Sequence, residues 1–167
     1  MTKVQVRLAE SQGDVDNCLR LRWMVFVEEQ GVPPSLEVDA HDSTDAVHAL
    51  ASLDGIPCGA ARFIFVEPGV AKLQRMAVID EARKNGAGRA LLRFLEDEAR
   101  QRGASRFILD AQVQARGFYE KQGYAARGEV FDDAGLPHLR MEKNAGEWSA
   151  DSGLHLTSRP PRRKSSP

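Results

Sequence analysis

The sequence predicts a single α/β domain whose mixed, mostly antiparallel sheet is flanked by helices. The first half of the 167-residue chain reads as successive strands joined by short turns, which is typical of an antiparallel meander. The second half reads as a strand, a helix and a strand in succession, which form a right-handed unit with parallel strands. A chain of this length supplies one domain with a sizeable core.

The predicted chain begins with a strand and a helix. Apolar and polar residues alternate over residues 4–8, which predicts a strand. Asp14 can cap a helix that runs to about Gln30, where a Gly-Val-Pro-Pro segment ends it. Residues 31–46 are polar and acidic, so we expect a loop there.

Three strands of an antiparallel meander follow, over residues 47–53, 56–66 and 70–79. Asp54-Gly55 separates the first two and is a strong hairpin signal. A Pro-Gly pair turns the chain again before the third strand. Gly59 interrupts a run of β-forming residues and is a candidate β-bulge.

The second half of the chain changes to an alternation of helix and strand. A helix is expected over residues 88–102, because apolar residues recur there at helical spacing along one face. Gly103 is placed to end it. The remaining expected elements are a strand over 106–111, a short helix over 115–122 and a hairpin of strands over 124–131 and 136–143.

The domain is expected to span residues 1–144, followed by a basic tail over residues 145–167. The tail is dominated by Ser, Gly, Pro and Arg and cannot bury enough apolar surface to offset its ordering entropy, so we expect it to be disordered. The N-terminus has no apolar signal region, and no run approaches about 18 apolar residues. We therefore expect a cytoplasmic protein without a membrane partner.

Charge and cysteine content exclude further classes. The formal net charge of −1 gives no overall preference for nucleic acid, so no such partner is expected. Two cysteines, Cys18 and Cys58, make no disulfide framework and are expected to be small buried residues.

The most informative segment is RKNGAGR, residues 83–89. It lies between an apolar strand and an amphipathic helix. A strand that leads through a glycine-rich turn into a helix brings free main-chain N–H groups and the positive end of a helix dipole to one point. The segment therefore predicts an anion site, and in this layout the expected anion is a pyrophosphate.

Two other interpretations of this segment compete. A nicotinamide-dinucleotide fingerprint is partly matched by Gly86, Gly88 and Asp110, but Leu91 occupies the third glycine position. The chain also offers one strand–helix–strand unit, which cannot make a doubly wound sheet. Alternatively, the glycines merely loosen the start of a helix. A Walker loop needs Gly-Lys-Ser/Thr, which the sequence lacks.

The arrangement Arg83-x-x-Gly86-x-Gly88 resembles the acyl-CoA loop of the GCN5-related N-acetyltransferase (GNAT) family. Other segments resemble the family in the same order. Leu73–Val78 is similar to its fourth strand, and Phe118–Tyr124 to its fourth helix and sixth strand. A narrower similarity, to the ElaA/YjcF-like branch, lies in Arg22–Gln30, Glu37-x-Asp39 and Gly135–Met141.

The resemblance implies the GNAT acyl-CoA N-acyltransferase fold, in which two central parallel strands splay apart and admit the coenzyme. It implies an N-acetyltransferase, an acyltransferase for groups other than aminoacyl groups, with acetyl-CoA as acyl donor. The amine of an unidentified acceptor, a small molecule or a protein, would attack directly, without a covalent enzyme intermediate. A homodimer is also compatible with the family. The alternative is a non-catalytic acyl-CoA-binding sensor or regulatory module.

The resemblance also implies which residues bind the coenzyme. Its phosphates are expected on the main chain of the 83–89 segment, with Gly86 and Gly88 small enough to let phosphate oxygens approach. The pantetheine arm is expected to pair with the edge of the strand at Met76–Val78, and a main-chain N–H near Met76 to stabilise the thioester oxygen. The full set expected at the coenzyme is Met76, Ala77, Val78, Arg83, Lys84, Gly86, Ala87, Gly88 and Arg89.

Two catalytic residues are expected. Tyr119 matches the tyrosine with which the family protonates the leaving thiolate. The base is drawn from Glu28, Glu29, Glu37, Asp39 and His138. We favour His138, because histidine is the residue type whose ordinary pKa lies nearest neutrality. The acidic loop has no calcium or zinc spacing, so no metal is expected.

Overall fold

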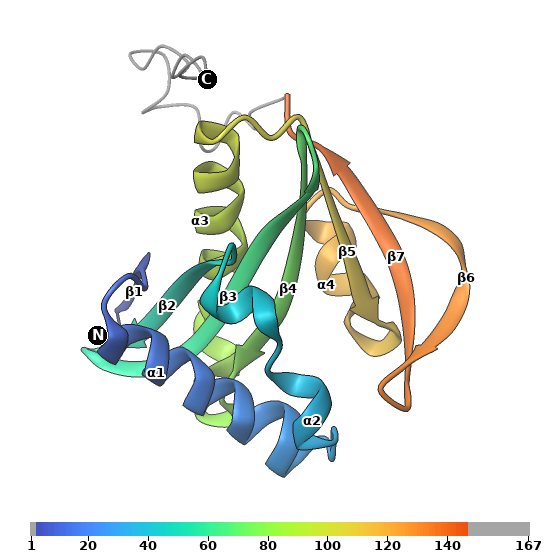
Figure 1. The fold of residues 1–167 in the computed structure, drawn as a ribbon. Helices are drawn as coiled ribbons and strands as arrows, with labels where there is room; N and C mark the ends of the chain where they lie inside the picture. The colour runs from blue at the N-terminus through green and yellow to red at the C-terminus, as the bar shows by residue number, and fades with distance from the viewer. Residues whose placement is uncertain (1–2, 147–167) are drawn as a thin grey trace.

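The computed structural model describes residues 3–146 and shows one seven-stranded mixed sheet in the order β1-β2-β3-β4-β5-β7-β6 (Figure 1). The strands are β1 (Val4–Leu8), β2 (Val47–Leu53), β3 (Ile56–Glu67), β4 (Val70–Val78), β5 (Arg106–Gln112), β6 (Ala125–Asp133) and β7 (Leu136–Asn144). The α-helices are α1 (Gln12–Arg22), α2 (Pro34–Glu37), α3 (Ala87–Gln101) and α4 (Arg116–Lys121). The predicted fold class is confirmed.

Helices cover both faces of the sheet: α1 lies across one face and α3 stands against the other (Figure 1). The side chains of β2 alternate accordingly. Leu50 packs with Cys18 and Leu21 of α1, whereas Ala49 and Ala51 belong to the larger core on the α3 side. The strand meander is thus sandwiched between the two helices.

The central parallel strands separate partway along their length. β4 pairs with β5 only from Val70–Arg106 to Leu73–Leu109. β5 then continues beside β7 as far as Gln112, while β4 continues beside β3. Figure 1 shows the two strands diverging from their shared end. The splay expected from the family resemblance is confirmed, and it leaves the edge of β4 that faces β5 unpaired beyond Leu73.

A β-bulge occurs in β4 where the strands separate. Its register with β3 slips between the pairs Arg62–Gln74 and Ala60–Ala77. Arg75 lies inside this slip with φ of +57°, a conformation that non-glycine residues seldom adopt. Such a bulge interrupts pairing and re-aims the chain, here at the opening of the gap.

Several local expectations need correction. Ser11, not Asp14, caps α1: its hydroxyl accepts from the Asp14 N–H at 3.1 Å, while Asp14 pairs with Arg7. The helix continues as a π-helix, η1 (Trp23–Glu29). The expected loop contains α2 and a 3₁₀ turn, η2 (Ala40–Ser43). The expected glycine-rich turn begins as a 3₁₀ helix, η3 (Asp80–Asn85), and another 3₁₀ turn, η4 (Val113–Ala115), precedes α4.

The bulge expected at Gly59 falls beside it. Ala51 pairs with Gly59 and Ser52 with Pro57, so Cys58 is the extra residue. Gly59 itself is a close-approach position. A Cβ there would lie 3.1 Å from the Ala77 carbonyl oxygen and 3.1 Å from Leu91 Cδ1. The glycine lets β3 pack against β4 and α3.

Other expectations concern the ends and the cysteines. Most of the expected tail, from residue 147 onward, lies outside the described residues. Cys18 and Cys58 are buried, free thiols, as expected. Over residues 3–146, no helix is long and apolar enough to cross a membrane. In the same range, no group of three or more His, Cys, Asp or Glu side chains could hold a metal ion.

Candidate active site

The gap between β4 and β5 contains a cavity of about 660 Å³. Its walls come from the end of η1, the unpaired part of β4, the start of α3, the end of β5, α4 and the turn before β7. These segments are far apart in the sequence and meet because the central strands separate. Eight of the eleven residues expected at the coenzyme or in catalysis line this cavity: Met76, Val78, Arg83, Gly86, Gly88, Arg89, Tyr119 and His138.

The start of α3 provides main-chain donors to one end of the cavity. Gly86 precedes the helix with φ of +80°, and no side chain in the described range 3–146 caps this end. The first N–H groups of a helix have no partner within the helix. Gly86 and Gly88 line the cavity next to them. This end therefore combines unpartnered N–H donors with the positive end of a helix dipole.

Packing does not explain the glycine at position 88. A Cβ on Gly88 would meet Phe118 Cζ at 3.6 Å, an ordinary contact. Gly86 differs, since its positive φ alone favours glycine. Because an alanine would fit at 88 in the protein as it stands, the small residue preserves space within the cavity.

The cations near this end have different surroundings. Arg83 is held by the protein: its guanidinium donates to the Val78 carbonyl oxygen at 2.9 Å and to Glu29 Oε1 at 2.7 Å. Arg89 is exposed and lines the cavity, whereas Lys84 is exposed and lies outside its lining. Glu29, placed unfavourably at a helix end, is explained by its pairing with Arg83.

The expected pantetheine edge lies along the unpaired part of β4. Met76 and Val78 line the cavity. Ala77, between them, is buried, and Ala87 at the start of α3 is buried in the core on the α3 side. Neither alanine is among the residues that line the cavity, so neither side chain is placed to contact a ligand there.

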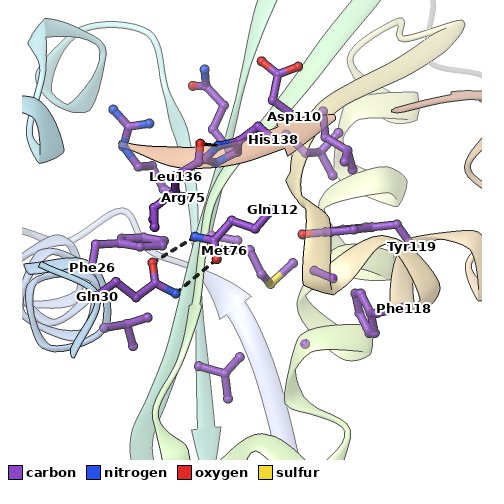
Figure 2. A pocket seen from close by; sticks show the side chains of 18 of the residues that line it. Phe26, Gln30, Arg75, Met76, Asp110, Gln112, Phe118, Tyr119, Leu136 and His138 are labelled. Carbon is purple, nitrogen blue, oxygen red and sulfur yellow. Dashed lines mark hydrogen bonds between the residues drawn. The ribbon is translucent and has the colours of Figure 1, made fainter. Parts of the chain in front are cut away.

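Tyr119 extends from α4 with its hydroxyl directed into the cavity (Figure 2). The ring packs edge-on against Phe118 and Tyr124, with centroid separations of 5.0 and 6.0 Å. Within residues 3–146 its hydroxyl has no hydrogen-bond partner. Burial raises the pKa of Tyr119 to about 12, so the phenol keeps its proton at neutral pH.

His138 lies in β7 and lines the same cavity (Figure 2). Its ring stacks on Phe131, and its Nδ1 lies 2.8 Å from the Leu136 carbonyl oxygen. Because a carbonyl oxygen can only accept, Nδ1 carries the hydrogen and Nε2 of the neutral ring is left as an acceptor. The tautomer is therefore the one that a general base acting through Nε2 requires.

Three of the four carboxylates considered as bases are paired with arginines, although Glu29 and Glu37 line the cavity. Glu37 is buried and paired with Arg22 at 2.6 Å. Asp39 pairs with Arg62, whose hydrogen bond holds the pKa of that carboxyl below its usual value. The hydrogen bond from Arg83 does the same to the pKa of Glu29. Glu28 is exposed and lies outside the cavity lining.

These acids belong to a buried ionic network, which we call the Arg22–Arg62 network. Both guanidiniums contact Asp42 Oδ1 at 2.6 Å, and Arg75 donates to the Glu37 carbonyl oxygen at 3.0 Å. The network fastens α2 and η2 over β3 and β4, beside the cavity. Its members are Arg22, Glu37, Asp39, Asp42, Arg62 and Arg75.

Sequence reasoning missed two cavity residues that contact one another. The side-chain amides of Gln30 and Gln112 exchange two hydrogen bonds across the gap (Figure 2). Gln30 follows η1, and Gln112 ends β5. Nothing local in the sequence pairs them. Their positions at the ends of a helix and a strand were the only available signal.

Comparison with known proteins identifies the family. The family model described as acetyltransferase (GNAT) domain matches residues 17–145. The chain belongs to the GNAT acetyltransferase family. YjcF of Bacillus subtilis, named an uncharacterized N-acetyltransferase, is 38% identical over 138 residues, which cover 82% of this chain and 97% of YjcF. The family membership predicted from the sequence motifs is confirmed.

Solved GNAT structures share the fold. An acyl-CoA N-acyltransferase from Pseudomonas aeruginosa superposes with a TM-score of 0.71 at 25% identity, covering 86% of this chain and 99% of the other. Escherichia coli ElaA superposes with a TM-score of 0.73 at 24% identity, over the same shares of the two chains. The family relationship makes the protein an acyl-CoA-dependent N-acyltransferase enzyme.

Proposed function

We propose that this GNAT protein transfers an acetyl group from acetyl-CoA to a primary amine by direct attack. The observation that carries the proposal is a single cavity lined by the start of α3, the unpaired edge of β4, Tyr119 and His138. Each of these supplies one requirement of acyl transfer: donor binding, stabilisation of the thioester oxygen and movement of two protons.

The donor is bound mainly by main-chain groups. The diphosphate of acetyl-CoA accepts from the N–H groups at the start of α3, where Gly88 leaves room and Arg89 adds positive charge. The pantetheine arm pairs with the edge of β4 from Met76 to Val78, as an added strand would. A main-chain N–H at Met76, next to the bulge at Arg75, donates to the thioester oxygen as charge develops there.

The reaction balances with two proton transfers. The amine nitrogen forms a bond to the thioester carbon, and the carbon–sulfur bond breaks. His138 Nε2 accepts the proton that the amine loses, and the Tyr119 hydroxyl gives its proton to the departing sulfur. The products are an acetamide and free CoA, and the two side chains return to their starting states through solvent.

The first test is thiol release from acetyl-CoA in the presence of a panel of primary amines. Tyr119→Phe should lower kcat by about 10²- to 10⁴-fold, the usual contribution of general acid–base catalysis. Tyr124→Phe is the matched control, because its hydroxyl donates to Glu96 at 2.7 Å and not into the cavity. Equal activity in wild type and Tyr119→Phe would remove the tyrosine from the mechanism.

A second test separates catalysis from binding alone. Calorimetric titration with acetyl-CoA should show one tight site, and a nicotinamide dinucleotide should not compete for it. If acetyl-CoA binds but no amine in the panel raises thiol release, a non-catalytic acyl-CoA-binding module replaces the enzyme proposed here.

The pH dependence gives an independent check on Tyr119. Its pKa of about 12 means that the acid form persists well above neutrality. The rate with a reactive amine should therefore not fall between pH 8 and roughly 10, the range below the ordinary tyrosine pKa. A decline in kcat in that range, absent from the binding of acetyl-CoA, would count against the phenol as the proton donor.

A further inference from the structure

The two amides that face each other across the gap form a crossbar, defined here as the side chains of Gln30 and Gln112. Gln112 Nε2 donates to Gln30 Oε1 at 2.9 Å, and Gln30 Nε2 donates to Gln112 Oε1 at 3.3 Å. Gln114 Nε2 also donates to Gln112 Oε1. Residues 82 positions apart are thus joined directly over the cavity.

The fold holds both ends of the crossbar in place. The Gln30 N–H donates to the Val25 carbonyl oxygen, five residues earlier, at 3.1 Å, so the π-helical turn sets where its side chain begins. Gln112 is fixed by the register of β5 with β7, where it pairs with His138. β4 does not pair with β5 at this level. At this level side chains, not main-chain pairing, join the end of β5 to the end of η1.

The crossbar lies where the acyl group of a bound donor must point. Figure 2 shows Tyr119 on one side of Met76, and Phe26 and Gln30 on the other. In the proposed function the sulfur meets the Tyr119 hydroxyl and the carbonyl docks at Met76. The carbon chain continues from the carbonyl away from the sulfur, toward Phe26 and the crossbar.

We propose that the crossbar limits the length of the acyl chain that the cavity accepts, so that Gln30 and Gln112 make the enzyme selective for short acyl groups such as acetyl. This inference rests on the proposed function, because it assumes that the thioester lies at Met76. A longer chain would have to separate the two amides and press methylene groups against their polar atoms, which then lose their partners.

The residues around the crossbar predict tighter binding of a longer acyl chain when one of the two amides is removed. Val25, Phe26, Val32 and Leu36 line the cavity on the η1 side. A chain that passes a shortened side chain would bury its methylene groups among these apolar residues. The proposal thus predicts broadened acyl specificity, not merely a weakened site.

The experiment is calorimetric titration of wild type, Gln30→Ala and Gln112→Ala with CoA, acetyl-CoA and hexanoyl-CoA. No acceptor amine is needed. Wild type should bind hexanoyl-CoA at least about tenfold more weakly than acetyl-CoA. Each variant should lose this difference, a relative gain of about tenfold, which is what burying two methylene groups supplies. Gln12→Ala, an exposed glutamine on α1 outside the cavity, should behave as wild type.

The binding of CoA itself separates the possible failures. All four proteins should bind CoA equally, which also shows that the variants fold. If wild type fails to bind CoA, the proposed function and the crossbar proposal both fall. If CoA binds but the ratio of hexanoyl-CoA to acetyl-CoA affinity is the same in wild type and both variants, only the crossbar proposal is overturned.

Discussion

The two sides of the gap are built in different ways. The side proposed to receive the coenzyme offers main-chain groups: the start of α3, which no side chain of residues 3–146 caps, and the edge of β4 that β5 leaves unpaired. The opposite side depends on the Arg22–Arg62 network, in which long side chains meet across the fold. One side needs glycine and regular secondary structure, whereas the other needs particular charges at particular distances.

This difference has an energetic consequence. Binding a ligand through main-chain groups adds little strain to the protein. It requires that the neighbouring side chains leave space for the ligand. A buried ionic network is costly to desolvate and stays favourable only while every charge keeps its partners. Arg22 and Glu37 are each 1% exposed, and Asp42 is 5% exposed. We therefore expect substitutions in the network to change stability, and substitutions at the start of α3 to change ligand affinity.

The largest expected effect is in the network. Arg22→Met should lower the free energy of unfolding by about 3–5 kcal/mol, because it leaves the buried Glu37 carboxylate without its cation. Urea denaturation measures the change. Arg102→Met is the control: Arg102 forms an exposed pair with Glu98 at 3.0 Å, a kind of pair that contributes less than about 1 kcal/mol. Equal losses in the two variants would contradict the distinction.

Two glycines separate an effect on stability from an effect on ligand affinity. Gly59→Ala should cost about 1–3 kcal/mol of stability, because the new Cβ overpacks the junction of β3, β4 and α3. CoA affinity of the folded variant should be unchanged. Gly88→Ala should leave stability within about 1 kcal/mol of wild type, since the packing admits a Cβ there.

The readout that distinguishes the glycines is coenzyme binding. Gly88→Ala should weaken CoA binding by at least about tenfold, a change of roughly 1.4 kcal/mol, because the methyl group occupies space that the phosphates need. Denaturation and calorimetry on both variants give the full comparison. If Gly88→Ala binds CoA as wild type does, the start of α3 is not the phosphate site.

A smaller effect is expected from His48, which lies against the network. It is buried, its Nε2 lies 3.1 Å from the Asp42 carbonyl oxygen, and its Nδ1 has no partner within the described part of the chain. Burial lowers the pKa of His48. The unfolded chain then binds a proton near the ordinary value of about 6.5, before the folded protein does.

Below about pH 6.5 the unfolded state gains protons, so the free energy of unfolding decreases as the pH falls. His48→Gln should make this decrease shallower between about pH 7 and 5. Urea denaturation at a series of pH values measures it, and parallel curves for the two proteins would exclude His48 as the source.

The same contrast explains how much could be predicted from the sequence. The strands, α3 and the glycines at 86 and 88 follow from local signals: alternation, helical spacing and turn residues. The splay of β4 and β5 came from the family resemblance. On the network side, residues 31–46 read as an acidic loop, because an ion pair such as Arg22–Glu37 depends on tertiary contact.

Other features had weaker or no local signals. Ser11 and Asp14 are both good helix-capping residues, and only the geometry decides for Ser11. The bulge at Arg75 lacks the glycine that a positive φ usually requires. The crossbar joins two glutamines from opposite halves of the chain. Side-chain contacts between distant segments are therefore what sequence patterns left undetermined, and they build the side of the gap opposite the start of α3.

The smallest expected effect tests the ion pair that links the two sides. Glu29 and Arg83 lie 2.7 Å apart with side chains 43% and 36% exposed, so Glu29→Gln should cost less than about 1 kcal/mol of stability. Removing this negative charge beside the proposed phosphate site should raise CoA affinity, by less than about threefold at low salt. The gain should vanish near 1 M salt, where the screening length falls to about 3 Å. A gain that persists at high salt would instead point to rearrangement of η1 and the crossbar next to it.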